Sequence, residues 1–513
     1  MIWALLLIPA VAGLLCLVLR PNAPRRALLV LAALGHSAAV AWAWADADGR
    51  RSAAIGAWMA IDEASLVFLS ITSLLFLAAA VYAVGYLARE NREPQHNPED
   101  GLPFENYSET VFTGCLLAFL ATMSLVAVSR HLGLIWVAVE ATTLVSAPLI
   151  YFHRHHRSLE ATWKYLVICS VGIALALLGN FFLVVATRAG GGEPIPLLLQ
   201  DLTAGAARLD HAWLKAAFLL LLVGYGTKMG LAPMHTWLPD AHSEAPSLVS
   251  ALLSGALLNC AFLAILRVHG LMVSAGLGDF SRELLVLFGL LSMALASVFI
   301  LNQADFKRML AYSSVEHMGI LALGIGIGGL AGYGSMLHAV NHSLTKGMLF
   351  LAAGNILAAC RTKSTLAARD LLRRLPVSGL LWLVGFLAIT GSPPFGPFLS
   401  ELTILKGMLD AGNVAVAVGY LLALAVVFVG MASVVLQMLY APVEAVELAG
   451  DAASHEAAPR VKGRAAEPQR EPEPLWSIVP PLALAAAVLV LGLWVPAPLA
   501  EMLQRAAAVV GVN

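Results

Sequence analysis

Fourteen long apolar segments run through this 513-residue chain, and they constrain its fold more than any other feature. A bilayer core about 30 Å thick is crossed by roughly 20 helical residues. Only 12% of the residues are charged and 59% are hydrophobic, too few charges to cover a soluble protein of this size. The sequence therefore predicts an all-α polytopic membrane protein with about 14 transmembrane helices. The segments lie at about 2–19, 27–45, 64–88, 109–129, 132–152, 163–187, 213–234, 247–268, 283–302, 309–329, 333–359, 376–410, 413–440 and 475–496.

Basic residues are distributed unevenly between the connections. Numbered in chain order, the odd connections hold nineteen Lys and Arg residues, whereas the even connections and the tail hold nine. Because basic loops stay in the cytoplasm, we expect the odd connections there and both termini outside. The apolar stretch 2–19 precedes its basic cluster, the reverse of a cleaved signal peptide, so it is expected to be a retained first helix. The expected location is the bacterial or archaeal inner membrane.

Two of the predicted spans are interrupted by glycine and proline. Span 7 runs into Lys228–Pro233, and span 12 is cut at Gly391–Gly396. Freed backbone groups are tolerated at membrane depth where they line protein or a water-filled cavity. Broken helices 7 and 12, five spans apart, indicate two inverted repeats. The expected divisions are helices 1–3 in 1–108, a first repeat (helices 4–8) in 109–268, a second repeat (helices 9–13) in 283–440, a mobile cytoplasmic loop in 441–474, and helix 14 in 475–513.

Ionisable side chains lie inside several of these spans. A charge at mid-membrane costs on the order of 2.5–3.5 kcal/mol on insertion scales, so it favours a functional interpretation. In span 11 three titratable residues are spaced i, i+4 and i+8, which places them in one stripe on a helix. The alternative interpretation is buried ion pairs, or helix-end residues reaching the headgroups. The candidates are Glu140, Lys228, His338, His342, Lys346 and Glu401, with Glu316, His317 and Lys406 nearer the span ends.

Such residues could pass protons. Burial lowers the pKa of a lysine and a nearby carboxylate raises it, so a lysine with a movable carboxylate partner can load and release a proton near neutral pH. Histidine is a natural relay between lysines. The candidates together predict a polar path through the membrane interior.

The sequence has few features that are typical of cofactor binding or nucleic-acid binding. Its five cysteines lie far apart with no C-x-x-C spacing, so we expect no iron-sulfur ligation and no cofactor in this chain. His153–Arg157 resembles a metal tract, but solvated positive charge in a cytoplasmic connection explains it better. The net charge of -1 shows no excess of the positive charge that nucleic-acid binding requires.

The segment 228–247, KMGLAPMHTWLPDAHSEAPS, resembles the signature of the antiporter-like subunits of respiratory complex I, Mrp antiporters and membrane-bound hydrogenases. The similarity continues at 250–255, 305–314 and 342–346. His235 and Asp240 belong to this signature, which explains them better than a zinc site does. The break at 392–396 followed by Ser400-Glu401, with a length near 500, is most similar to the F component of hydrogenase-4 and formate hydrogenlyase complexes.

The resemblance implies fourteen helices, an inverted repeat and a proton path along the membrane midplane. It implies that Glu140 modulates Lys228 and that Glu401 is the terminal residue. It also places His317, His342 and Lys346 on the central axis. Relatives often have a lysine in span 8 where this chain has Asn259, so water or histidine bridges there or the path is incomplete.

The leading hypothesis is a proton-translocating membrane subunit of a multi-subunit oxidoreductase. Its partners would be other antiporter-like membrane subunits and a soluble redox arm, hydrogenase-like or quinone-reductase-like, in which electron transfer takes place. The first alternative is a subunit of an Mrp-type cation/proton antiporter driven by ion gradients. The second is a membrane scaffold whose proton path has decayed, which Asn259 permits.

Overall fold

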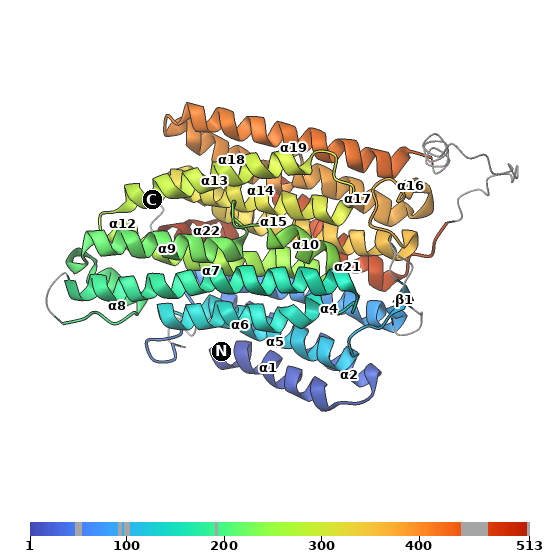
Figure 1. The fold of residues 1–513 in the computed structure, drawn as a ribbon, viewed down its shortest axis with the longest axis horizontal. Helices are drawn as coiled ribbons and strands as arrows, with labels where there is room; N and C mark the ends of the chain where they lie inside the picture. The colour runs from blue at the N-terminus through green and yellow to red at the C-terminus, as the bar shows by residue number, and fades with distance from the viewer. Residues whose placement is uncertain (47–53, 91–94, 97–102, 190–192, 443–469, 510–513) are drawn as a thin grey trace, which may run out of the picture.

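The computed structural model describes residues 1–46, 54–90, 95–96, 103–189, 193–442 and 470–509. Long helices lie side by side along one direction and form a single bundle (Figure 1). The amino-terminal helices form one flank of the bundle and α19 forms the opposite flank. The helices of the first half are α1 (Ile2–Val18), α2 (Asn22–Ala45), α4 (Glu63–Glu90), α5 (Glu109–Val128), α6 (Leu132–Ile150), α7 (His156–Ala189), α8 (Leu199–Ala204), η1 (Ala206–Arg208), α9 (His211–Met229), α10 (Trp237–Glu244), α11 (Ser247–Leu252), η2 (Leu253–Leu257) and α12 (Leu258–Ser274).

The second half continues the same architecture. Its helices are α13 (Gly278–Ile300), α14 (Phe306–Ile327), α15 (Gly329–Cys360), α16 (Leu371–Arg374), α17 (Pro376–Ile389), α18 (Gly396–Asp410), α19 (Val414–Tyr440), α21 (Leu475–Leu493) and α22 (Ala497–Val509). The strands in the described residues are β1 (Gln95–His96) and β2 (Pro103–Phe104), which pair antiparallel.

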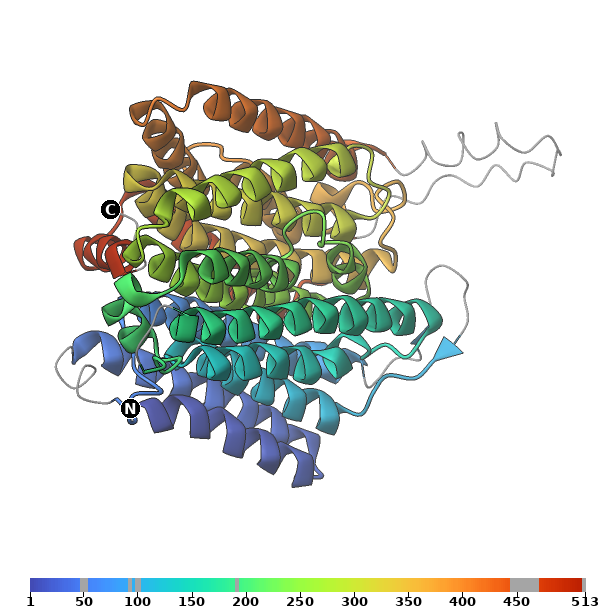
Figure 2. The same cartoon turned by 60° about the vertical axis from the view of Figure 1, so that its left-hand side comes forward.

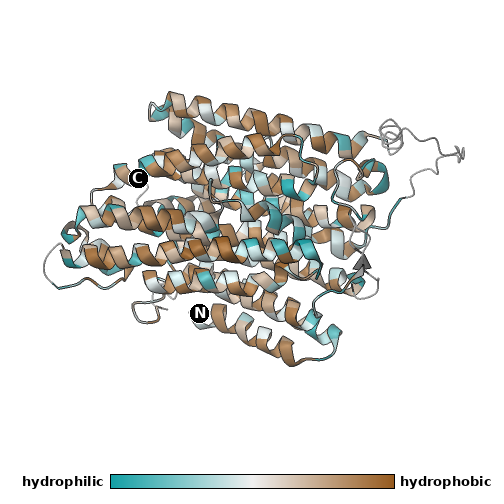
Figure 3. Ribbon diagram, viewed as in Figure 1, coloured by the Kyte–Doolittle hydropathy of each residue, from teal (hydrophilic) through white to brown (hydrophobic). Residues whose placement is uncertain are grey.

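Helices occupy all fourteen predicted segments, which confirms an all-α polytopic fold. Twelve helices of the described chain are long and apolar enough to cross a membrane, and α1 and α17 are shorter apolar helices. The count of fourteen crossings therefore stays a prediction. Hydrophobic residues follow the length of the outer helices, and hydrophilic residues gather at helix ends and among the central helices (Figure 3).

The two termini lie at the same end of the bundle. The end of α19 and the start of α21, which flank the predicted loop 441–474, lie at the opposite end (Figures 1 and 2). This agrees with an even number of crossings, whichever side faces the cytoplasm. Most of the 441–474 loop falls outside the described residues. The chain after span 14 forms a separate helix, α22, which packs on α4 and α15 and which the sequence analysis had not distinguished from helix 14.

Both predicted helix breaks are confirmed. Helix α9 ends at Met229, where Gly230 adopts a left-handed conformation with φ of 84°, and the chain becomes helical again at α10. Helix α17 ends at Ile389, Gly391 has φ of 65°, and α18 begins at Gly396. Glycine accepts positive φ without the steric penalty of a Cβ atom. The division into repeats 109–268 and 283–440 stays a prediction.

Helices α7 and α9 pack with their backbones close together. A Cβ atom on Gly224 would lie 2.6 Å from the amide nitrogen of Ala176 and 2.6 Å from the carbonyl oxygen of Gly172. Both neighbours are backbone atoms, so they move only if the two helices separate. Small residues at membrane helix interfaces commonly permit such close approach.

We expect Gly224→Ala to lower the free energy of unfolding by about 1–3 kcal/mol, the range typical of overpacking. The measurement is the thermal unfolding of the detergent-solubilised protein. The control is Gly35→Ala in α2, where a Cβ atom would make ordinary contacts of 3.5 Å with the Ile8 side chain. Equal stability of the two variants would contradict the proposed backbone clash.

Candidate functional site

Lys228 lies in the last turn of α9, directly before the first break, and its side chain is fully buried. Its Nζ atom donates hydrogen bonds to Thr143 Oγ1 at 2.8 Å and to the Tyr165 hydroxyl at 2.6 Å. The same Nζ lies 4.4 Å from the centre of the Tyr165 ring and 5.9 Å from that of Trp237. A buried ammonium needs such acceptors and aromatic faces because water no longer solvates it.

Glu140 is connected to Lys228 through a hydroxyl group. The half-buried Glu140 accepts hydrogen bonds from Thr143 Oγ1 at 3.3 Å and from Ser170 Oγ at 3.1 Å. Thr143 therefore contacts both the carboxylate on α6 and the ammonium on α9. The predicted pair is brought together, with a hydroxyl that can both donate and accept between its members.

A cluster of three histidines lies in α14 and α15. His317 Nδ1 and His338 Nε2 share a hydrogen bond of 2.9 Å, and His338 Nδ1 lies 2.9 Å from Ser400 Oγ. The ring of His342 lies 5.0 Å from that of His317. All three side chains are buried. The predicted stripe of α15 thus faces α14, and His317, 21 residues away in the chain, completes the cluster.

Lys346, one turn beyond His342, is also fully buried. Its Nζ donates a 2.7 Å hydrogen bond to the carbonyl oxygen of Leu310. Glu316 is within electrostatic reach of both Lys346 and Glu401. Glu316 Oε1 is buried and has no hydrogen-bond partner among the described residues. The sequence placed Glu316 near a span end, but the structure places it in the interior, only 1% exposed.

Glu401 lies in α18, just after the second break, and is 5% exposed. Its Oε2 atom occupies the space that a Cβ atom on Gly391 would need. Glycine at position 391 therefore meets two requirements. It adopts a positive φ, and it leaves room for the Glu401 carboxylate.

His317, His338 and Glu401 bring ligand atoms within 4.8 Å of one another, the one such group of His, Cys, Asp and Glu in the part of the chain that the structure describes. A divalent metal could in principle use these three side chains. However, His317 and His338 already share a hydrogen bond, an arrangement that suits proton transfer between neighbouring rings.

Neutral side chains connect the two charged clusters. Asn259 Nδ2 donates to Ser343 Oγ on α15 and to the Gly255 carbonyl oxygen, both at 2.8 Å. Cys260, the next residue, is within electrostatic reach of Lys228. Nearby, the hydroxyl groups of Ser254 and Ser314 lie 2.8 Å apart. Asn259 therefore contacts α15 and directly precedes a residue near the Lys228 cluster.

Three of the candidate residues lie apart from these clusters. Asp240 pairs with Lys164 at 2.9 Å and with Arg308 at 3.0 Å. The Lys406 side chain is 64% exposed and pairs with Asp410 at 2.5 Å. His235 packs against aromatic rings, with its centre 6.2 Å from that of Tyr312.

In the suspected metal tract, His153 is hydrogen-bonded to Asn106 and to the Tyr86 hydroxyl. Burial first, and then the neighbouring cationic groups, lower the pKa of this connecting-loop histidine to about 3. His153 is therefore neutral at physiological pH, unlike the solvated positive charge expected from the sequence, and it links this connection to Asn106 and to α4.

Sequence reasoning missed the neutral groups that contact the charged ones. Thr143, Tyr165 and Ser170 make the hydrogen bonds of the Lys228 cluster, and Ser400 contacts His338. A neutral polar residue in an apolar span carries no charge signal. For Thr143, the one available signal was its spacing of three residues from Glu140, which puts both on one face of α6.

Two broken helices and a buried series of acidic and basic side chains, within one helical bundle, are typical of proton-translocating membrane proteins. The family described as "NADH:quinone oxidoreductase/Mrp antiporter, TM" matches residues 129–430, more than half of the chain. The chain belongs to this family.

Individual relatives agree with this assignment. The chain is 38% identical to the hydrogenase-4 component F homolog of Methylacidiphilum infernorum, over 68% of this chain and 72% of that protein. A chain of respiratory complex I from Thermus thermophilus is 27% identical with a TM-score of 0.73, covering 96% of this chain and 97% of that one. A chain of an archaeal membrane-bound sulfane sulfur reductase has the same fold, with a TM-score of 0.84 at 21% identity, covering 99% and 97%.

The bridging role of Thr143 can be tested by removing its hydroxyl. We expect Thr143→Val to slow proton translocation roughly 10- to 100-fold, because losing a hydrogen bond to a charged group costs about 1.5–3 kcal/mol. The measurement is the quenching of a pH-sensitive dye in membrane vesicles energised by the complex's electron donor. Thr143→Ser keeps the hydroxyl and serves as the matched control. If valine and serine translocate equally, the hydroxyl is not needed.

Proposed function

We propose that this chain is the proton-translocating membrane subunit of a multi-subunit oxidoreductase of the hydrogenase-4 or NADH–quinone oxidoreductase type. The observation that carries the proposal is the contact of one hydroxyl, Thr143 Oγ1, with both the Lys228 ammonium and the Glu140 carboxylate. An ammonium whose carboxylate partner moves closer or farther changes its proton affinity. Lys228 can thereby be loaded and unloaded while it stays buried.

The proton then has a series of groups to follow. Lys228 would pass it across the Asn259–Ser343 contact toward Lys346 in α15. Asparagine does not hold a proton at neutral pH, so this step uses hydroxyl groups and water that can donate and accept in turn. The histidine cluster beside Lys346 would relay the proton to Glu401, the terminal group beyond the second break.

The energy would come from partner subunits. The chain would hold no redox cofactor of its own, and electrons would move in a soluble hydrogenase-like or quinone-reductase-like arm. Other antiporter-like subunits would be its membrane neighbours. In the proposed location, a prokaryotic inner membrane, the nineteen basic residues of the odd connections would face the cytoplasm and both termini the outside.

A decayed proton path is the second candidate function, favoured by Asn259 alone. Proton translocation is supported by more observations, because ionisable residues on both sides of Asn259 are buried. Buried ions that lost their function would be costly to retain.

We expect Lys228→Met to abolish proton translocation and leave electron transfer in the partner subunits intact. Dye quenching and donor oxidation should be measured in the same vesicles. Lys215→Met is the matched control, because Lys215 is exposed and lies near the start of the same helix. Full translocation by Lys228→Met would refute the proposed role. Sodium-dependent transport without any electron donor would instead favour the Mrp-type antiporter.

A further inference from the structure

A cavity of about 530 Å³ opens at the end of the bundle where α4 and α15 end. It is bounded by the last residues of α4 and α15 and by the segment that leads into α21. Its volume is in the range of small-ligand sites. Because the cavity lies at helix ends, a bilayer around the bundle would bring lipid headgroups to its level, and none of the residues of the proposed proton path lines it.

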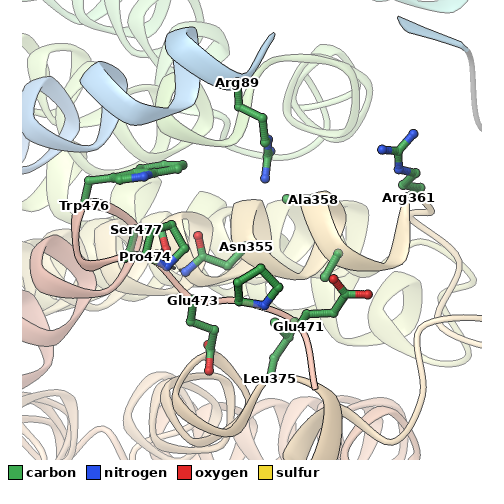
Figure 4. A pocket seen from close by; sticks show the side chains of 12 residues that line it. Arg89, Asn355, Ala358, Arg361, Leu375, Glu471, Glu473, Pro474, Trp476 and Ser477 are labelled. Atoms are coloured by element: carbon green, nitrogen blue, oxygen red, sulfur yellow. Dashed lines mark hydrogen bonds between the residues drawn. The ribbon is translucent and has the colours of Figure 1, made fainter. Parts of the chain in front are cut away.

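The cavity brings together charges of both signs. Arg89, from the end of α4, points into it, and Arg361 lies beside it at the end of α15 (Figure 4). Arg89 has no hydrogen bond or ion pair within the described residues. Both guanidinium groups suit a phosphate, which they can bind through paired N–H donors.

Glu471 and Glu473 supply negative charge on the opposite wall. The Glu473 carboxylate accepts hydrogen bonds from the backbone N–H groups of Val377 and Ser378, so it is already satisfied by the start of α17. The Glu471 side chain has no ion pair in the parts of the chain that the structure describes. The cavity thus offers one cationic and one anionic wall.

Apolar surface continues from the cavity toward the membrane. Trp476 lines it, and tryptophan is typical of membrane interfaces. On α21, the outward residues Leu475, Val479 and Leu482 are 77%, 51% and 51% exposed. A ligand with a charged head in the cavity could therefore lay acyl chains along α21.

We propose that this cavity binds the headgroup of an aminophospholipid, with a phosphate toward Arg89 and Arg361 and a primary ammonium toward Glu471. The two walls match the two charges of this headgroup better than those of phosphatidylglycerol, whose neutral glycerol headgroup offers no cation to Glu471. They also favour a primary ammonium over a choline, which has no N–H to donate to the carboxylate.

The test is native mass spectrometry of the full-length chain, stripped of lipid in detergent and then supplied with one lipid at a time. We expect phosphatidylethanolamine to bind about tenfold more tightly than phosphatidylcholine or phosphatidylglycerol, as the loss of one charged hydrogen bond predicts. Equal binding of the three lipids would overturn the proposal without any variant. Soluble glycerophosphoethanolamine, if it bound as tightly as the lipid, would show a site for free headgroups and refute a lipid site.

Two variants localise the binding. Arg89→Gln and Glu471→Gln should each remove the preference for phosphatidylethanolamine. Arg373→Gln is the matched control, because this arginine at the same end of the bundle is 78% exposed and lies outside the cavity. A preference that survives both cavity variants would place the lipid elsewhere and overturn the proposal.

Discussion

The first half of this structure must compensate for the free-energy cost of burying an ammonium group in an apolar bundle. Lys228 is solvated by a hydroxyl and a phenol, and the helix break beside it helps to provide that environment. Gly230 ends α9 immediately after Lys228, and the chain returns with Trp237. The Trp237 indole donates to the carbonyl oxygen of Thr227 at 2.8 Å, while its ring lies near the ammonium. The break is therefore part of the lysine's solvation and also satisfies backbone groups that the helix end leaves free.

The second half of the structure compensates for the cost of burying carboxylates. Glu401 follows the second break, and its oxygen fits beside Gly391 because no Cβ atom is present there. Glu316 and Lys346 lie within electrostatic reach of each other in the interior, where an ammonium and a carboxylate offset part of each other's cost of burial. Both breaks thus bring a charged side chain into the bundle at the point where glycine frees the backbone from regular helix.

The sequence predicted the features that depend on local pattern, and it missed those that depend on packing. Apolar length predicted the spans, and glycine and proline predicted the two breaks. Helical periodicity placed His338, His342 and Lys346 on one stripe, which the structure buries. The contact of Lys228 with Tyr165, by contrast, joins residues 63 positions apart, and no local pattern identifies a tyrosine as a lysine partner. The amphipathic helix α22 was missed because its apolar stripe is too short to resemble a span.

Asn259 has an electrostatic consequence as well as a chemical one. A lysine at that position would add a second buried positive charge near Lys228, and like charges at close range in a low-dielectric interior oppose each other's protonation. With asparagine there, Lys228 can take up a proton without that opposition, and its proton affinity depends mainly on its own partners. Asparagine also offers the proposed path no proton-holding group between α9 and α15. Transfer in that region then depends on how readily the Asn259–Ser343 hydrogen bond and its neighbouring hydroxyls reorient.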